Sequence, residues 1–114
     1  MENLLELVDE LTSKIKNSSC YKDYLISKEN IQKDTELYSK ICDFKKIHTE
    51  FQKKKHNGEY ISLDYEKDIS KRYHNLILNN DAKIFLENEK ALIKLIGNIY
   101  NKITTDCIFE LDIL

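Results

Sequence analysis

The chain of 114 residues contains no proline and only two glycines, Gly58 and Gly97. Domains built from β-strands, or from alternating strands and helices, need many tight turns and usually place glycine and proline in them. The shortage of both residue types argues against those classes and predicts a chain that is helical almost throughout. At this length we expect one domain, residues 1–114.

The sequence also has no excess of one charge and no long apolar run. It carries 18 basic and 20 acidic residues, whereas a general nucleic-acid binder shows a clear basic excess. No stretch of about 18 apolar residues is present to suggest a transmembrane helix. The N-terminal segment, MENLLELVDEL, lacks the basic start and uninterrupted apolar core of a signal peptide. We therefore expect a cytoplasmic protein that is not inserted in a membrane and does not bind nucleic acid directly.

The three cysteines are Cys20, Cys42 and Cys107. An odd number with wide spacing suits free thiols in a reducing compartment better than a disulfide framework. Structural metal sites usually carry a Cys-x-x-Cys pair, which this sequence lacks, so no metal or cofactor site is predicted. Cys20 falls near a predicted helix N-terminus, a place where thiols become more reactive. A redox-sensing or iron–sulfur protein is therefore kept as an alternative.

Apolar residues recur at spacings of three and four through most of the chain, which predicts helices. Polar breaks at 17–19, 34–35, 57–58 and 79–81 separate them and supply capping residues such as Ser18, Asp34 and Ser62. The predicted helices run from about Glu2 to Lys16, Cys20 to Lys33, Asp34 or Thr35 to His56, Ser62 to Leu78, and Ala82 to Thr105.

The third and fourth of these helices flank Asn57-Gly58 and predict an antiparallel helical hairpin. Both residue types tolerate the left-handed conformation that ends a helix. The pair is also typical of a β-hairpin, but the preceding QKKKH completes a helical period, so we reject that alternative. His48 is expected to be partly buried and hydrogen-bonded on the apolar seam. The seam residues are Leu37, Ile41, Phe44, His48 and Phe51 before the turn, and Ile69, Tyr73, Leu76 and Ile77 after it. The spacing leaves open whether this stripe closes on its own chain or on a second copy.

The fifth helix is the most apolar and is expected to be the best buried. Gly97 lies within it and is interpreted as a point of close helix–helix approach. Glu89 interrupts one apolar row and is expected at the edge of the stripe, with a buried interface position as the alternative. The rows are Ala82, Phe85, Glu89, Leu92, Ile96, Ile99 and Ile103, and then Leu86, Ile93, Tyr100 and Cys107. The C-terminal tail, residues 108–114, is rich in apolar residues, which predicts a helical turn, a short strand or an arm that packs on a partner chain.

No arrangement of residues typical of catalysis is found. No histidine pairs with a serine or cysteine as an activated nucleophile would, and the two isolated glycines form no phosphate-binding loop. The basic run Lys53-Lys54-Lys55-His56 would suit RNA phosphates. Such a run more often ends a helix, where cations complement the dipole, and we prefer that interpretation. We assign no catalytic, cofactor-binding or metal-binding residue and expect a protein that is not an enzyme.

Several segments carry a resemblance to a known family. They are Tyr21-Lys22-Asp23-Tyr24, Asp34-Thr35-Glu36, the seam at Phe44 with the turn from His56 to Tyr60, and Asn79-Asn80 followed by Phe85-Leu86-Glu87-Asn88-Glu89. In order and spacing the chain resembles the YlbF/YmcA family of bacterial regulators over nearly its whole length. It departs from the family at two breaks, where Thr35 and Asn80 stand in place of frequent prolines. It also ends at Leu114 without a longer cysteine-bearing tail, so the resemblance does not extend to tail-dependent iron–sulfur binding.

The resemblance implies an all-α protein, here an elongated bundle of about five helices with a long central antiparallel hairpin. It further implies a non-catalytic adaptor that forms homodimers or larger homo-oligomers. Its implied partners are family relatives and ribonuclease Y, whose mRNA processing it would modulate. Through that it would affect competence, sporulation and biofilm formation. Weak RNA binding is the remaining alternative.

Overall fold

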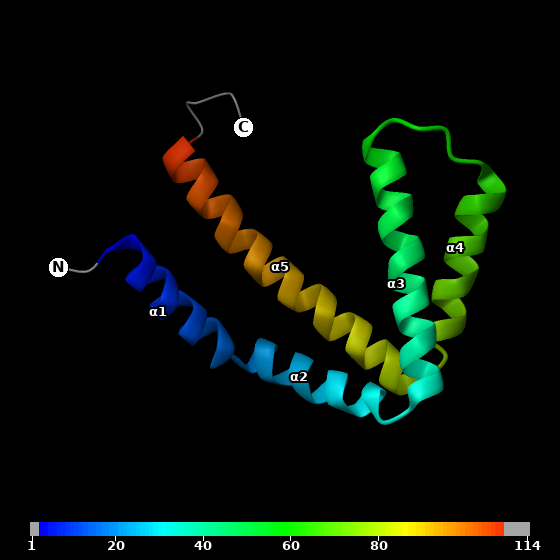
Figure 1. Ribbon diagram of the computed structural model, residues 1–114, viewed down its shortest axis with the longest axis horizontal. Helices are drawn as coiled ribbons and strands as arrows, with labels where there is room; N and C mark the ends of the chain where they lie inside the picture. Colours follow the sequence, from blue (N-terminus) through cyan, green and yellow to red (C-terminus); the bar gives the residue numbers. More distant parts are fainter. Residues whose placement is uncertain (1–2, 109–114) are drawn as a thin grey trace. The chain divides into compact units, whose positions relative to one another are not determined.

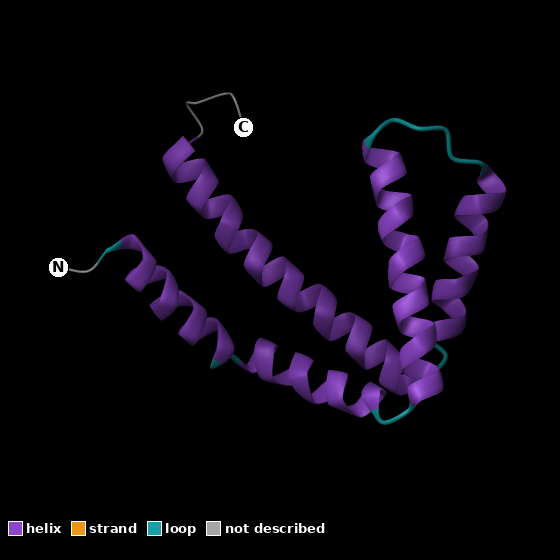
Figure 2. Cartoon of the chain, in the orientation of Figure 1, coloured by secondary structure: helices purple, strands orange, loops and turns teal. Residues whose placement is uncertain are grey.

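The computed structural model describes residues 3–108, which form five α-helices and no strand (Figures 1 and 2). The helices are α1 (Leu4–Lys16), α2 (Ser19–Gln32), α3 (Thr35–His56), α4 (Leu63–Leu76) and α5 (Asn80–Ile108). The all-α prediction is confirmed. No helix in the described range is long and apolar enough to cross a membrane. The predictions for Glu2 and for the tail from Phe109 onward fall outside the described residues.

Polar side chains begin the helices, as the sequence predicts. Asn3 accepts a hydrogen bond from the Glu6 backbone N–H at 2.8 Å, while the Glu6 carboxylate accepts one from the Asn3 N–H at 3.3 Å. This capping box starts α1 two residues later than predicted. Asn79 Oδ1 accepts from the Ala82 N–H at 3.1 Å, so α5 begins at Asn80 rather than Ala82.

The Asn57-Gly58 break ends α3 with a Schellman motif. The Gly58 N–H donates to the Lys55 carbonyl at 3.2 Å, and the Glu59 N–H donates to the Lys54 carbonyl at 2.9 Å. Gly58 has a φ of 72°, the left-handed region that glycine occupies without a Cβ penalty. The pair therefore closes a helix and does not form a β-hairpin.

The chain divides into two compact units, and the second, Ser27–Leu86, contains almost all of the buried core. The stripe on α3 is buried against its own chain. Phe44 lies 5.9 Å from the Tyr73 ring, and Phe51 lies 6.0 Å from the Tyr65 ring, measured between centroids. Because the later residue of α3 meets the earlier residue of α4, the two helices run antiparallel. The buried apolar residues of this unit are Ile31, Leu37, Ile41, Phe44, Phe51, Ile69, Leu76, Ala82 and Phe85.

One predicted seam residue is not where the spacing placed it. His48 is exposed, not partly buried, and it stacks on Phe44 with centroids 5.6 Å apart. Its Nε2 forms a hydrogen bond with the Gln52 side chain at 3.2 Å. The buried face of α3 instead passes from Phe44 to Phe51, seven residues or two turns later. The imidazole therefore covers the edge of the seam and keeps its polar atoms at the surface.

The first unit comprises the chain up to Ile26 together with the chain from Glu87 onward. Leu92 is its one buried apolar residue within the described range. The Asn88 amide donates to the Asp23 carbonyl at 3.2 Å and ties α5 to α2. The prediction that α5 is the best-buried helix is wrong for this part, since Ile93, Ile96 and Ile103 are about half exposed or more. Gly97 marks no close approach within the chain, because a Cβ added there would meet nothing within 4 Å.

Candidate interaction surfaces

The helix α1 presents an exposed apolar face. None of its side chains is buried. Leu4 is 79% exposed, Leu5 75% and Val8 52%, and Leu7 and Leu11 are also exposed. Single exposed apolar residues are ordinary, but five on one thirteen-residue helix form a patch of the kind that marks a contact surface.

The second half of α5 presents a matching row. Ile93, Ile96, Tyr100 and Ile103 are all exposed and follow one another at spacings of three, four and three. That spacing is the seam of a coiled coil, in which each apolar residue inserts between residues of a facing helix. The sequence contains this signal, but we assigned these residues to two buried rows and did not recognise them as one exposed seam.

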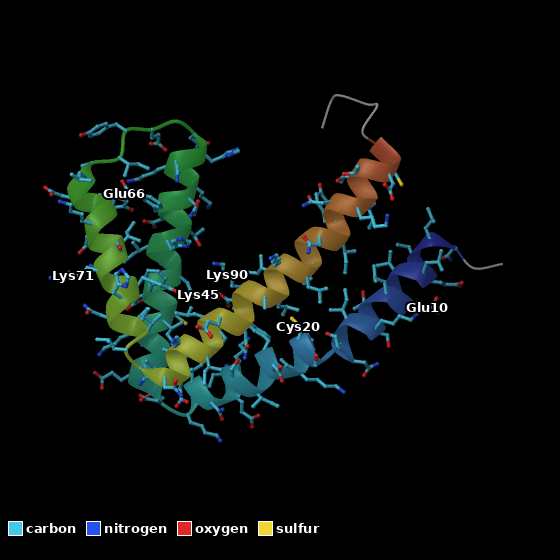
Figure 3. All side chains as sticks on the ribbon, turned by 180° about the vertical axis from the view of Figure 1, so that it is seen from behind. Glu10, Cys20, Lys45, Glu66, Lys71 and Lys90 are labelled. Carbon is cyan, nitrogen blue, oxygen red and sulfur yellow. The ribbon has the colours of Figure 1, made fainter. Side chains whose placement is uncertain are left out.

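Charged residues also lie on the two helices. Glu6, Asp9 and Glu10 lie on α1, while Lys90, Lys94 and Lys102 lie on α5; Figure 3 labels Glu10 and Lys90 on their helices. All six side chains are solvent-exposed. At about 100° per residue, Glu6 lies opposite the apolar face of α1, and Lys94 and Lys102 lie away from the exposed row of α5. Lys102 also pairs with Asp106 at 3.0 Å. These charges therefore do not border the two apolar rows.

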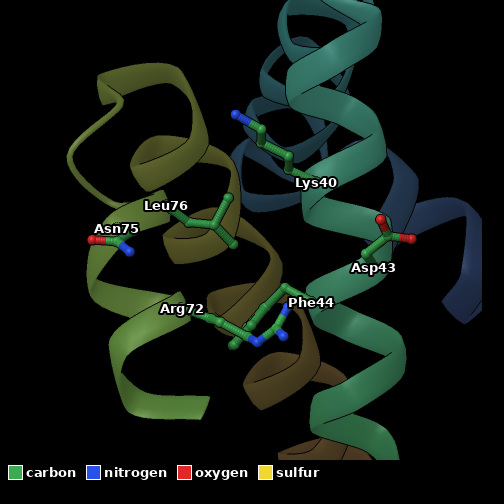
Figure 4. Close-up of a pocket in the computed structure, with 6 residues that line it drawn as sticks. All are labelled: Lys40, Asp43, Phe44, Arg72, Asn75 and Leu76. Carbon is green, nitrogen blue, oxygen red and sulfur yellow. The ribbon is translucent and has the colours of Figure 1, made fainter. Parts of the chain in front are cut away.

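A separate open hollow of about 320 Å³ lies between α3 and α4 (Figure 4). Its wall is mixed: Phe44 and Leu76 supply apolar surface, while Asp43 and Arg72 supply opposite charges. The Arg72 guanidinium already donates to the Asp68 carboxylate at 2.9 Å. Lys40 pairs with Glu36 at 3.5 Å. Both cations of the lining are therefore already paired with carboxylates of their own helices, so neither is left to select an anion.

The basic run forms the C-terminal end of α3, as we predicted. Lys53, Lys54, Lys55 and His56 form the last turn. The Lys54 ammonium lies 5.1 Å from the centre of the Tyr65 ring, which is within cation–π range. This lysine therefore contacts α4, while its neighbours remain in solvent at the negative end of the helix dipole.

Within the described residues, the cysteines and Glu89 do not come together in a metal or redox site. Cys20 lies half-buried at the start of α2 (Figure 3), and Cys42 and Cys107 are exposed on α3 and α5. All three are free thiols. Within residues 3–108, no group of three His, Cys, Asp or Glu side chains is placed to hold a metal ion. Glu89 is half-buried, at the edge of the apolar stripe.

Comparison with known proteins gives a consistent family. The family described as "Control of competence regulator ComK, YlbF/YmcA" matches residues 4–106. A "UPF0342 protein" of Caldicellulosiruptor bescii is 33% identical over 108 residues, which cover 95% of this chain and 90% of that protein. A second "UPF0342 protein", from Halothermothrix orenii, is 34% identical over 88% of this chain and 81% of its own length. No solved structure matches. The resemblance seen in the sequence motifs is confirmed.

Proposed function

Because the chain belongs to the YlbF/YmcA family, we propose that it is a non-catalytic regulatory protein that works by binding other proteins. The observation that carries the proposal is the family match, which spans residues 4–106 and so includes all the helices but the last residues of α5. The family's description names control of competence, and we place this chain in that kind of regulation.

The finer proposal concerns the partner. The YlbF/YmcA resemblance implies an adaptor for ribonuclease Y, and we propose that this chain docks on that enzyme and modulates its processing of mRNA. Competence, sporulation and biofilm formation would respond through those transcripts. The exposed apolar faces of α1 and α5 support a binding role, since surfaces of this kind mark contact sites.

Recovery of partners from cells tests this proposal. The full chain, tagged and expressed at its native level, is used as bait in a native lysate, with the tag alone as control. We expect ribonuclease Y or family relatives in the bait sample and not in the control. Repeated recovery of neither would contradict the proposed partners. A genome that holds this gene but no ribonuclease Y gene would contradict them as well.

We also propose that the protein is cytoplasmic and forms homodimers or larger homo-oligomers. Apolar patches on two helices leave surface in water that association would remove, and that burial is favourable by roughly 25 cal/mol per Å². Light scattering of the purified chain should give a mass of two or more chains at micromolar concentration. A strict monomer across that range would refute self-association while leaving the ribonuclease Y proposal to its own test.

A further inference from the structure

Asn57 and Gly58 form the only Asn-Gly pair in the chain. In such a pair the backbone nitrogen of the glycine can attack the side-chain amide carbon of the asparagine, because glycine has no side chain to hinder the approach. Each of the other asparagines precedes a residue that carries a side chain. The attack is therefore favoured at Asn57 above every other asparagine.

The pair lies at the C-terminal end of α3, in the loop that Figure 2 draws between α3 and α4. Both residues are exposed, so water reaches them. A Cβ added to Gly58 would meet nothing within 4 Å. No packed neighbour therefore blocks the approach of the Asn57 side chain to the Gly58 nitrogen.

The helix end slows this reaction but does not prevent it. Asn57 has a φ of −80° and a ψ of 0°, which turns the Gly58 nitrogen away from the side-chain carbon. That nitrogen also donates to the Lys55 carbonyl at 3.2 Å, and the Glu59 N–H donates to the Lys54 carbonyl at 2.9 Å. Helix ends open locally at low cost. Breaking two ordinary hydrogen bonds lowers the rate by a factor on the order of 30, which leaves a measurable reaction.

Asn17, at the end of α1, provides a comparison within the same chain. It is also exposed and also closes a helix, with a φ of −90° and a ψ of −3°. The next residue is Ser18, whose hydroxyl donates to the Ile15 carbonyl at 2.6 Å and accepts from the Tyr21 N–H at 3.2 Å. The two asparagines thus share their exposure and backbone conformation and differ in the residue that follows.

We propose that Asn57-Gly58 is a site of spontaneous deamidation, and that the isoaspartate formed there opens the C-terminal end of α3. The Gly58 backbone nitrogen loses its proton and forms a bond to Asn57 Cγ. The side-chain –NH2 leaves with that proton as ammonia, and a succinimide ring remains. Water then opens the ring at one of its two carbonyl carbons. One opening gives aspartate, and the other gives isoaspartate, in which the main chain runs through the former side chain.

Both products change the end of α3. Each carries a new carboxylate at the negative end of the helix dipole, which is unfavourable. The basic residues of the last turn of α3 offset this charge. In isoaspartate the main chain is also longer by one carbon before Gly58, so the N–H groups of Gly58 and Glu59 no longer keep both of their bonds to α3. We therefore expect the longer main chain to have the larger effect.

Incubation of the purified full chain at neutral and at mildly alkaline pH tests the site. Peptide mapping by mass spectrometry measures the exchange of –NH2 for –OH at each asparagine, and an isoaspartyl methyltransferase labels isoaspartate. We expect the Asn57 peptide to change several-fold faster than the Asn17 peptide. The rate should rise with pH, because the attacking nitrogen must lose its proton. In denaturant the rate at Asn57 should rise by a factor on the order of 30.

The matched control is Asn57→Gln, whose longer side chain would have to close a larger ring, and which should show no change at this position. Equal rates at Asn57 and Asn17 would overturn the assignment of the site. A mass change at Asn57 without isoaspartate would overturn it as well, since direct hydrolysis of the amide gives only aspartate. A rate that denaturant leaves unchanged would contradict the protection by the helix end.

Urea unfolding tests the effect on α3. Ion exchange isolates the modified chains by their added negative charge, and Asn57→Asp supplies the aspartate form alone. We expect the isoaspartate-rich fraction to unfold at a lower urea concentration than Asn57→Asp, which should lie close to the unmodified chain. Coincident transitions for the isoaspartate-rich fraction and Asn57→Asp would overturn the claim that isoaspartate opens the helix end.

Discussion

Replacement of Ile41 by alanine gives the clearest test of the core. Ile41 is 1% exposed and lies on α3 between Leu37 and Phe44. The change removes three buried carbon groups at about 0.8 kcal/mol each, and the cavity left behind adds a further cost. We therefore expect Ile41→Ala to lower the free energy of unfolding by about 3 kcal/mol. That is a large fraction of the roughly 5–15 kcal/mol typical of a domain.

The matched control is Ile84→Ala in the same unit. Ile84 is 42% exposed on α5, and alanine is the stronger helix former, so the loss should be below about 1 kcal/mol. Urea unfolding followed by circular dichroism measures both, with the slope against urea expected to stay constant. Equal losses for the two variants, or a loss under about 1 kcal/mol for Ile41→Ala, would refute the assignment of this stripe to the core.

Three further changes test the caps and the seam by the same unfolding measurement. Gly58→Ala should lower the free energy of unfolding by about 1–2 kcal/mol, because φ at this residue is 72°. Gly97→Ala, inside a helix with open space around it, should raise the free energy of unfolding by about 0.5–1 kcal/mol. A change of the same sign for both variants would contradict the assignment of Gly58 to a left-handed helix end. Ser62→Ala should cost about 1 kcal/mol by removing the acceptor of the Tyr65 N–H at 3.1 Å, and the exposed Ser70→Ala should cost nothing measurable. Phe51→Asp places a charge at a buried position and should abolish cooperative unfolding of α3 and α4; retention of wild-type stability would show that Phe51 is not in the core.

The helices were predictable because their signals are local. Spacings of three and four mark the buried face of α3, and Asp34, Ser62 and Asn79 cap helices through bonds that reach only three residues ahead. Gly58 was equally readable, since a left-handed helix end favours glycine. Errors at boundaries such as Asn80 arose where several adjacent residues were all suitable caps.

The exposed seam could not be assigned from the pattern alone. Apolar periodicity shows that Ile93, Ile96 and Tyr100 share a face, but not whether a neighbour in the same chain covers it. The error at His48 has the same origin. The spacing of a residue along a helix predicts which side of the helix its side chain is on, but not how deeply that side chain is buried. Burial depends on how many helices surround a face, and that is a property of tertiary packing.

The most direct test of the proposed regulation measures transcripts. Cells with and without this gene are compared for the processing of mRNAs cut by ribonuclease Y, with deletion of the ribonuclease Y gene as the reference. If the chain is an adaptor for that enzyme, its deletion should reproduce the reference pattern in part, with unprocessed transcripts accumulating. Processing that is identical with and without the gene, in cells where ribonuclease Y is active, would contradict the account.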